Sequence, residues 1–355
     1  MKILTVENIK QILERHGFDD FLLELISTLK EDFSNWRAFT KMPRPAMHVS
    51  GGVMELMPIC DNRKYYTFKY VNCHPSNPNF EKQTVVATGQ LSNITTGYPL
   101  MFSEMTVLTA LRTAATSALA TDLMARRDSH VLALIGTGAQ SEFQVRGHGL
   151  VRDIEEVRYF DIDRGAMDKF EKNIRAENLR LTRCKDAKEA VLGADIITTI
   201  TACKANVDVI KNDWVTPGVH INALGGDTIG KTELELSILP RSRVVVEYFE
   251  QSFIEGEIQR FKESKARDLV YGQLNEIIEG TKTGRQSPDE ITLFDSVGIA
   301  LEDYSVLRLV FELCSKYRIG EEREFVPVLN DPKNLIGIFG KKLNNSEEVN
   351  SYGNL

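Results

Sequence analysis

The stretch VLALIGTGAQS, at residues 131–141, carries the strongest indication of the fold. Its first half is a short, continuous apolar run, which is the pattern of a β-strand buried on both faces. The run leads into the glycine motif G-x-G-x-x-S, and a helix is predicted directly after it. A buried strand, a glycine turn and a helix in this order are typical of a Rossmann-type dinucleotide-binding unit.

Further apolar runs predict the other strands of the same sheet. They lie at 157–163, 195–201, 219–226, 243–248 and 291–296. Amphipathic stretches between them predict helices at 165–177, 186–192 and 232–239. Strands that alternate with helices form βαβ units. We therefore expect an α/β fold with a Rossmann-type, doubly wound parallel sheet at residues 130–310.

The residues before this domain have a different pattern. Apolar residues recur at helical spacing within 5–39, and residues 46–104 are typical of an antiparallel meander of strands. A helix rich in Ala, Thr and Leu is predicted at about 104–126. We expect a separate α+β domain at residues 1–129.

The end of the chain is predicted to return to this first domain. Residues 296–317 predict a long helix, and we expect the segment 311–340 to complete the first domain. Residues 341–355 are polar and predict a mobile tail.

Composition argues against several classes of protein. The 355 residues carry 43 basic and 50 acidic side chains, a net charge of −7, which disfavours nucleic-acid binding. No apolar run approaches the roughly 20 residues that cross a bilayer, and the N-terminus lacks a secretory apolar region. Five scattered cysteines without a C-x-x-C pair indicate free thiols in a reducing compartment, so we expect a cytoplasmic protein. The six histidines show no ligand spacing, and we expect no metal site.

The glycine motif has the features of a cofactor site. Gly136 allows the tight turn, and Gly138 lets the backbone approach a pyrophosphate at the helix N-terminus. Ser141, in place of the usual third glycine or alanine, is small enough for close helix packing. Asp161, at the end of the next strand, can accept hydrogen bonds from a ribose 2′-hydroxyl, which favours NAD, whereas the nearby Arg164 keeps NADP open. A glycine turn that binds no dinucleotide is the alternative.

A second glycine pair precedes a candidate catalytic acid. Gly225 and Gly226 follow a predicted parallel strand, so Asp227 lies at the carboxyl end of the sheet, where α/β proteins bind ligands. We expect the two glycines to let the backbone pass close to a cofactor. Asp227 is equally well explained as the cap of a following helix.

Charged residues of the first domain are further candidates. Arg112 is flanked by small residues, so its guanidinium could pair with a carboxylate or phosphate, or could face solvent. Lys69 alternates with aromatics in a strand and points either to solvent or into a cleft. Arg44 lies between prolines, and Glu55 is a charge within an apolar strand. Taken singly, each is better explained as a surface charge than as a ligand.

Long strings of residues across nearly the whole chain resemble one family. The strings are WRAF, ELMP, FKYVNCHP, TTGYPLMFSEMT, ALRTAATS, ALIGTGAQSEFQ, DIITTITA, GGDTIGKTEL, EGEIQ, GRQS and FDSVGIALEDY. Together they resemble the ornithine cyclodeaminase/μ-crystallin family and, within it, the bacterial ornithine cyclodeaminases.

The resemblance implies roles for the charged residues. Arg44, Lys69 and Arg112 would hold the substrate α-carboxylate, and Glu55 and Asp227 would face its side-chain amine. It implies a homodimer whose N-terminal strands pair across the interface, so that the first domain binds substrate and dimerises. The resemblance also implies NAD as the cofactor, in a site that the strand 294–298 closes. The implied cofactor-binding residues are Thr84, Arg112, Gly136, Gly138, Ala139, Gln140, Asp161, Thr201, Leu224, Gly225, Gly226, Asp227, Lys231 and Ser296.

The implied reaction is the NAD-dependent, deaminating cyclisation of L-ornithine to L-proline and ammonia. Hydride leaves Cα for NAD⁺, the δ-amine, deprotonated by Asp227, attacks the α-iminium, ammonia departs, and hydride returns to the cyclic imine. We expect burial to raise the pKa of Asp227 toward neutrality. The alternatives are a lysine cyclodeaminase, an amino-acid dehydrogenase or ketimine reductase, and a non-catalytic NAD(P)H binder, which Asp227 disfavours.

Overall fold

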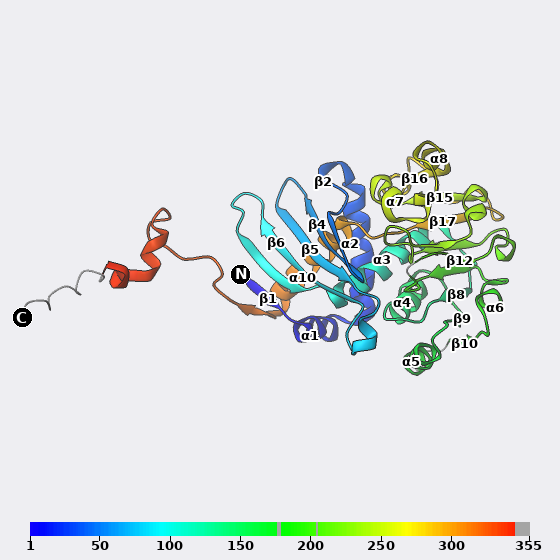
Figure 1. Cartoon of the computed structure of the whole chain (residues 1–355), viewed down its shortest axis with the longest axis horizontal. Helices are drawn as coiled ribbons and strands as arrows, with labels where there is room; N and C mark the ends of the chain where they lie inside the picture. Colours follow the sequence, from blue (N-terminus) through cyan, green and yellow to red (C-terminus); the bar gives the residue numbers. More distant parts are fainter. Residues whose placement is uncertain (176–178, 204, 345–355) are drawn as a thin grey trace, which may run out of the picture.

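Two sheets, each covered by helices, make up the body of the molecule, and a C-terminal segment leads away from it (Figure 1). The computed structural model describes residues 1–175, 179–203 and 205–344. Within this part of the chain, no helix has both the length and the apolar character needed to cross a membrane.

The first sheet contains the predicted antiparallel meander. Its order is β18-β1-β7-β6-β5-β4-β2, and β3 also pairs with β4. Neighbours from β4 to β7 are antiparallel, whereas β1 joins β7 in parallel. The strands are β1 (Lys2–Leu4), β2 (Thr40–Lys41), β3 (Ala46–Val49), β4 (Gly52–Cys60), β5 (Tyr65–Cys73), β6 (Val85–Asn93), β7 (Pro99–Glu104) and β18 (Glu321–Glu322).

Helices cover one face of this sheet and share one hydrophobic core with it. They are α1 (Val6–His16), α2 (Phe18–Ser34), α3 (Thr106–Met124) and α10 (Ala300–Tyr317). The helix predicted within 296–317 is therefore confirmed. It packs against α2, α3 and the strands β4 to β6, so residues 300–310 lie with the first sheet although we expected them in the nucleotide domain.

The second sheet is parallel throughout, which confirms the Rossmann-type prediction. Its order is β10-β9-β8-β11-β13-β17-β15-β16. The chain moves outward from β8 through β9 to β10 and then crosses to β11 on the other side of β8, so the strand order reverses there. Open α/β sheets bind ligands at such a reversal point. The strands are β8 (Val131–Ile135), β9 (Glu156–Phe160), β10 (Arg180–Arg183), β11 (Ile196–Thr199), β13 (His220–Ala223), β15 (Ser242–Val246), β16 (Val270–Gln273) and β17 (Ile291–Asp295).

Both faces of the second sheet are buried, as the continuous apolar runs predict. Leu132 and Leu134 of β8 face one core with α4 and α5, whereas Ala133 and Ile135 face another with α6, α7 and α8. The helices are α4 (Ser141–Val151), α5 (Arg164–Ile174), α6 (Ala187–Val191), α7 (Phe249–Glu255), α8 (Glu263–Leu269) and α9 (Leu274–Ile278). Residues 176 and 177, at the end of one predicted helix, lie outside the described residues.

The helix predicted at 232–239 is wrong. Thr232–Leu234 forms β14, which pairs in parallel with β12 (Asn206–Ile210), and a 3-10 helix, η4 (Leu236–Arg241), follows. Pro240 lies inside η4 and cannot donate the hydrogen bond that an α-helix needs. The other 3-10 helices are η1 (Trp36–Ala38), η2 (Asn77–Phe80), η3 (Asn212–Trp214), η5 (Glu257–Arg260) and η6 (Leu335–Asn344).

The C-terminal segment contains a short strand and a 3-10 helix. β18 pairs with β1, and the 3-10 helix η6 continues to Asn344, inside the stretch predicted as a mobile tail. The remainder of that predicted tail, residues 345–355, lies outside the described residues.

Candidate functional site

A cavity of about 150 Å³ lies where the first sheet meets the carboxyl ends of the parallel strands. It gathers most of the charged residues that the sequence analysis selected. Its lining is Arg44, Val53, Glu55, Lys69, Val71, Asn72, Cys73, Val85, Thr109, Arg112, Thr113, Gln140, Ile200, Thr201, Leu224, Gly225, Asp227, Thr228, Lys231, Ser296, Val297 and Gly298.

Two buried cations of the cavity are held by acids from α10. Lys69 of β5 pairs with Asp303, with 2.8 Å between Nζ and Oδ1. Arg112 of α3 pairs with Glu302 and, through Nε at 3.3 Å, with the same Asp303 oxygen. Lys69 is 1% exposed and Arg112 6% exposed, so neither is the surface charge that each would be if taken singly.

The Arg44 guanidinium lies close to five oxygen atoms of the protein. Nε lies 3.0 Å from Glu55. Nη1 donates to the carbonyls of residues 297 and 298 at 3.2 and 3.3 Å. Nη2 donates to the Asp227 carbonyl at 2.8 Å and pairs with Glu255. This side chain therefore joins the segment between β2 and β3 to two loops and to helix α7 of the nucleotide half.

Burial and crowding of charge shift the pKa values in the cavity. Burial, followed by the charges of Glu255 and Asp227, raises the pKa of Glu55 to about 7 despite Arg44. Burial, together with the nearby Arg112 and Arg44, lowers the pKa of Lys69 to about 8 although Asp303 opposes the shift. Both groups therefore change charge close to neutral pH.

A buried carboxylate holds the loop that closes the cavity. Glu247, which is 0% exposed, accepts from Ser296 Oγ at 2.5 Å and from the Gly298 N–H at 2.8 Å. Gly298 has φ +77°, and a Cβ there would lie 2.6 Å from Arg112 Nη1. A glycine is therefore required both by the backbone conformation and by the close approach of the guanidinium.

Asp227 lies beside a lysine at the mouth of the cavity. Its Oδ1 accepts from Lys231 Nζ at 2.9 Å. The Asp227 side chain is 42% exposed, so the burial that we expected to raise its pKa is not found. Asp227 does not begin an α-helix, because the next element is strand β14.

The glycines before Asp227 make room for buried carboxylates. A Cβ on Gly225 would lie 2.0 Å from Glu233 Oε2, and one on Gly226 would lie 2.9 Å from Glu257 Oε1. Glu233 in turn accepts from the Thr201 N–H at 2.9 Å. We expected a cofactor to lie close to these glycines. In the structure, the side chains of Glu233 and Glu257 lie close to them instead.

The glycine turn after β8 has the predicted geometry. Gly136 has φ +102°, and a Cβ there would lie 2.8 Å from the Ile200 carbonyl, whereas the space at Gly138 is open. Asp161 Oδ2 accepts from the Thr137 N–H at 2.6 Å and so fixes the turn. Gln140 Oε1 is buried and has no hydrogen-bond partner within the described chain.

Some predicted residues do not line this cavity. Thr84 lies just before β6, and its carbonyl accepts from the His74 N–H at 2.8 Å, while its neighbour Val85 does reach the cavity. The others outside the lining are Gly136, Gly138, Ala139, Asp161 and Gly226.

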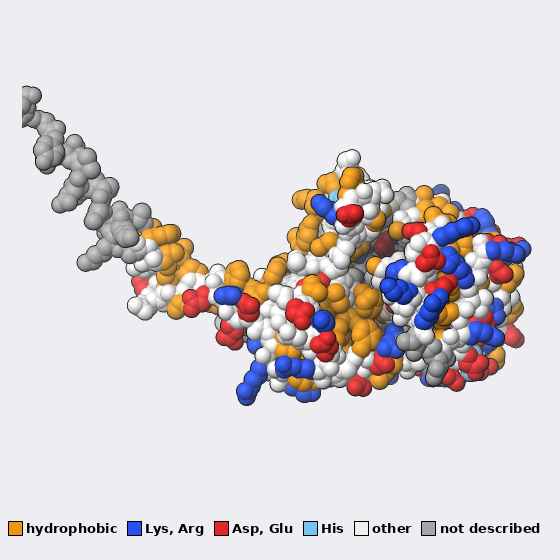
Figure 2. All heavy atoms as spheres, turned by 90° about the horizontal axis from the view of Figure 1, so that it is seen from below, with side chains coloured by type: hydrophobic (Ala, Val, Ile, Leu, Met, Phe, Trp, Pro, Cys, Tyr) orange, Lys and Arg blue, Asp and Glu red, His pale blue; other side chains and the backbone are white. Residues whose placement is uncertain are grey.

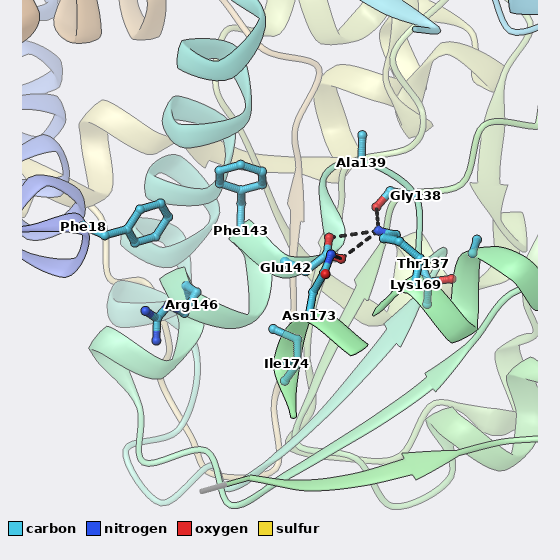
Figure 3. A pocket seen from close by; sticks show the side chains of 11 residues that line it. Phe18, Thr137, Gly138, Ala139, Glu142, Phe143, Arg146, Lys169, Asn173 and Ile174 are labelled. Carbon is cyan, nitrogen blue, oxygen red and sulfur yellow. Dashed lines mark hydrogen bonds and ion pairs between the residues drawn. The ribbon is translucent and has the colours of Figure 1, made fainter. Parts of the chain in front are cut away.

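Gly138 and Ala139 instead border a second, open hollow of about 710 Å³ between α4, α5 and the start of α2 (Figure 3). Lys169 of α5 points to the glycine turn there, donates to the Gly138 carbonyl at 2.9 Å and pairs with Glu142 at 2.8 Å. The two hollows have no lining residue in common, although residues 137–139 border one and the adjacent Gln140 borders the other.

The acids that support the cations were missed in the sequence. They are Glu247, Glu255, Glu302 and Asp303. A usable signal existed, because Glu247 directly follows an apolar strand and Glu302 and Asp303 lie in the first turn of a helix, directly after the apolar residues 297–301. Among the described residues, the one cluster of potential metal ligands is His130, Asp153 and Glu155, away from this cavity and mostly exposed.

The chain matches known proteins over most of its length. The sequence profile of the ornithine cyclodeaminase/mu-crystallin family matches residues 6–317. The ornithine cyclodeaminase of Agrobacterium tumefaciens (strain Ach5) is 44% identical over 335 residues, which cover 94% of this chain and 93% of that protein.

Solved structures show the same fold. A lysine cyclodeaminase, described with L-lysine, L-ornithine and L-2,4-diaminobutyric acid, superposes with a TM-score of 0.88 at 29% identity, covering 94% of this chain and 98% of that one. An archaeal alanine dehydrogenase dimer with bound NAD gives a TM-score of 0.84 at 32% identity, covering 92% and 99%. By profile, sequence and structure, the chain belongs to the ornithine cyclodeaminase/mu-crystallin family.

Proposed function

We propose that this enzyme is an NAD-dependent ornithine cyclodeaminase that converts L-ornithine to L-proline and ammonia. The observation that carries the proposal is the cavity itself, in which buried cations and two acids lie together at the carboxyl ends of the parallel strands. A diamino acid has the matching charges, because it carries one carboxylate and two amines.

The residues around the glycine turn fit NAD. The open space at Gly138 lets a pyrophosphate approach the N-terminus of α4, and the unpartnered Gln140 Oε1 offers an acceptor. Asp161 accepts from Thr137 and Asp163, and a carboxylate has about four acceptor positions, so capacity is left for a ribose hydroxyl. When bound, NAD supplies reversible hydride acceptance, and a cyclodeamination leaves it unchanged overall.

Lys69 and Arg112 would bind the α-carboxylate. In the described chain, Lys69 Nζ has Asp303 as its one hydrogen-bond partner, and Arg112 Nη2 has none, so both retain donors. Both Nη atoms of Arg44 already donate to backbone carbonyls, so they would reach the carboxylate by exchanging one of these partners. Fixing the carboxylate at two points orients Cα toward the nucleotide half.

Glu55 and Asp227 would handle the side-chain amine. Asp227 is close enough to Glu55 to raise its pKa, so the two acids face the same region of the cavity. We assign to Glu55 the pairing with the δ-ammonium and to Asp227 the removal of its proton, which frees the amine to attack Cα. Alanine has no such amine, so this pair favours a cyclodeaminase over an alanine dehydrogenase.

Lysine is the second candidate substrate. It carries the same charges with one more methylene, and a methylene is worth only about 1–3 kcal/mol of discrimination. The similarity to a lysine cyclodeaminase that is described with both amino acids supports keeping it.

We also propose that the chain forms a homodimer through the outer face of the first sheet. This face is apolar although no helix covers it, with Leu56, Tyr66, Tyr70 and Val86 each 37–46% exposed. Leu56 lies directly opposite Tyr70, and Val86 lies opposite Asn72, two residues further along β5. Contiguous exposed apolar surface of this kind marks an interaction site. No disulfide joins any two of the five cysteines in the described chain, which fits a reducing, cytoplasmic location.

One assay tests the activity. The protein is incubated with L-ornithine, L-lysine or L-alanine and a trace of NAD⁺, and ammonia, cyclic imino acid and NADH are quantified. Ammonia and proline without accumulating NADH support the proposal. NADH in proportion to substrate indicates a dehydrogenase, and no turnover with any of the three contradicts an amino-acid enzyme of this class.

A further inference from the structure

The segment after β18, residues 323–339, stands clear of the body of the molecule (Figures 1 and 2). We call it the C-terminal arm. Its residues are exposed except for the half-buried Val326 and Leu329. Figure 2 shows apolar side chains gathered at its outer end.

The arm has the composition of a segment that packs against protein. Its large exposed apolar side chains are Phe325, Val328, Leu335, Ile336, Ile338 and Phe339, with exposed fractions of 49–82%. Flexible linkers are rich in Gly, Ser or charge instead. Each apolar side chain that leaves water contributes about 25 cal/mol per Å² buried, so this sequence favours a covered state.

The point where the arm leaves the body is fixed. β18 pairs with β1, and Met1 and Arg323 exchange backbone hydrogen bonds at 3.0 and 2.9 Å. The arm therefore starts from one edge of the first sheet and is directed away from its own chain (Figure 1).

We propose that the arm packs on the first sheet of a second copy of this chain. The proposal rests on the homodimer proposed above, in which the outer sheet faces meet. An arm that starts at a sheet edge then begins beside the partner's sheet and can run along the rim where the two sheets meet.

The reach of the arm fits this arrangement. An extended segment of twelve residues, such as 323–334, spans about 40 Å. Strands lie about 4.8 Å apart, so the strand path β18-β1-β7-β6-β5-β4-β2 is roughly 30 Å wide. The apolar residues of η6 can thus reach the far edge of the partner's sheet, where Met42, Met47 and Val49 are exposed.

Relatives carry the arm as well. The family profile ends at residue 317. The alignment with the A. tumefaciens protein is 335 residues long, which is more than residues 1–317 can hold, so this similarity continues into the arm. The segment is therefore shared beyond the catalytic core.

Cross-linking of the full-length protein tests the contact directly. A photoreactive phenylalanine analogue replaces Leu335. Chains grown with ¹⁴N and chains grown with ¹⁵N are unfolded, mixed and refolded, so that a link between two copies joins peptides of different isotope. The cross-linked peptides are then sequenced by mass spectrometry. Mixed-isotope links to β2–β6 are expected. Links within single chains only, or no link in a chain that still refolds, overturn the proposal.

A second measurement uses substitutions. Leu335→Asp with Ile336→Asp should weaken dimerisation at least about tenfold by sedimentation equilibrium, because the acids oppose burial. Leu192→Asp, the same change at an exposed leucine of the nucleotide half, is the control and should leave dimerisation unchanged. An equal response of both variants, or of neither, contradicts the proposal. Neither readout needs turnover, so an inactive protein with arm cross-links would refute the proposed reaction and leave the arm contact standing.

Discussion

Lys69 and Asp303 form a buried ion pair across 234 residues of sequence, with 2.8 Å between Nζ and Oδ1 and each side chain 1% exposed. The pair joins β5 of the first sheet to α10, the helix that follows the nucleotide half. The proposed carboxylate site therefore contacts α10, the helix with which the chain returns to the first domain. The stability of that site depends on α10.

Removing the acid of this pair should destabilise the protein. Asp303→Asn leaves Lys69 buried without a counter-charge, and breaking a buried pair in this way costs about 3–5 kcal/mol. Urea unfolding measures the change. Glu31→Gln breaks the pair with Arg308, in which Glu31 is 63% exposed, and should cost below about 1 kcal/mol. Similar costs for the two variants would show that Lys69 does not depend on Asp303.

A methyl group at Gly298 should displace Arg112. Gly298→Ala puts a Cβ 2.6 Å from Arg112 Nη1, and misplacing a substrate-binding group by about 1 Å lowers rates about 100-fold. We expect that loss in kcat/KM for ornithine. Gly280→Ala is the control, because Gly280 also has positive φ, at +74°, but has open space around it. Equal losses would assign the effect to backbone strain alone.

Gly138 should matter for the cofactor and not for folding. Its surroundings are open, so Gly138→Ala should leave the free energy of unfolding nearly unchanged while it weakens NAD binding, because the methyl group holds the pyrophosphate off the backbone. Titration calorimetry with NAD⁺ checks this. Gly149→Ala in the same region, also in open space, should not affect NAD binding. Unaltered NAD affinity in Gly138→Ala would place the dinucleotide elsewhere.

Asp227 should be required for turnover and not for NAD binding. Asp227→Asn removes the proposed proton acceptor while it keeps the size of the side chain, and loss of a general base lowers rates by about 100- to 10,000-fold. Single-turnover kinetics and NAD titration together check the assignment. A variant that loses NAD affinity but retains the intrinsic rate would assign Asp227 to cofactor binding.

The pH profile of kcat/KM should be bell-shaped, because it reports ionisations of the free enzyme. As pH falls through about 7, Glu55 takes up a proton and no longer offers a charge to the δ-ammonium, so kcat/KM falls. As pH rises through about 8, Lys69 loses its proton and no longer attracts the carboxylate, so kcat/KM falls again.

Variants separate these two limbs from titration of the substrate's own amines. Glu55→Gln should abolish the acid limb and leave the alkaline limb in place. Lys69→Arg should move the alkaline limb upward, because arginine keeps its charge. An acid limb that persists in Glu55→Gln would assign it to another group.

The sequence predicted the second sheet well because its signals are local. A parallel strand buried on both faces reads as an apolar run, and Gly136 and Asp161 act within 30 residues of each other, at the ends of adjacent strands. The 232–239 segment failed for the opposite reason. Its amphipathic pattern suits a helix, but pairing of β14 with β12, a contact between two strands that the pattern of 232–239 does not encode, decided its structure.

The α/β class, the glycine turn, the ligand end of the sheet and the identity of the charged residues follow from the sequence. Only the tertiary structure decided their partners: that Glu255 engages Arg44, that Glu302 and Asp303 hold Arg112 and Lys69, and that Glu233 fills the space at Gly225. The reason is physical. Periodicity and turn propensity act over a few residues, whereas an ion pair depends on which segments the completed fold brings within about 4 Å.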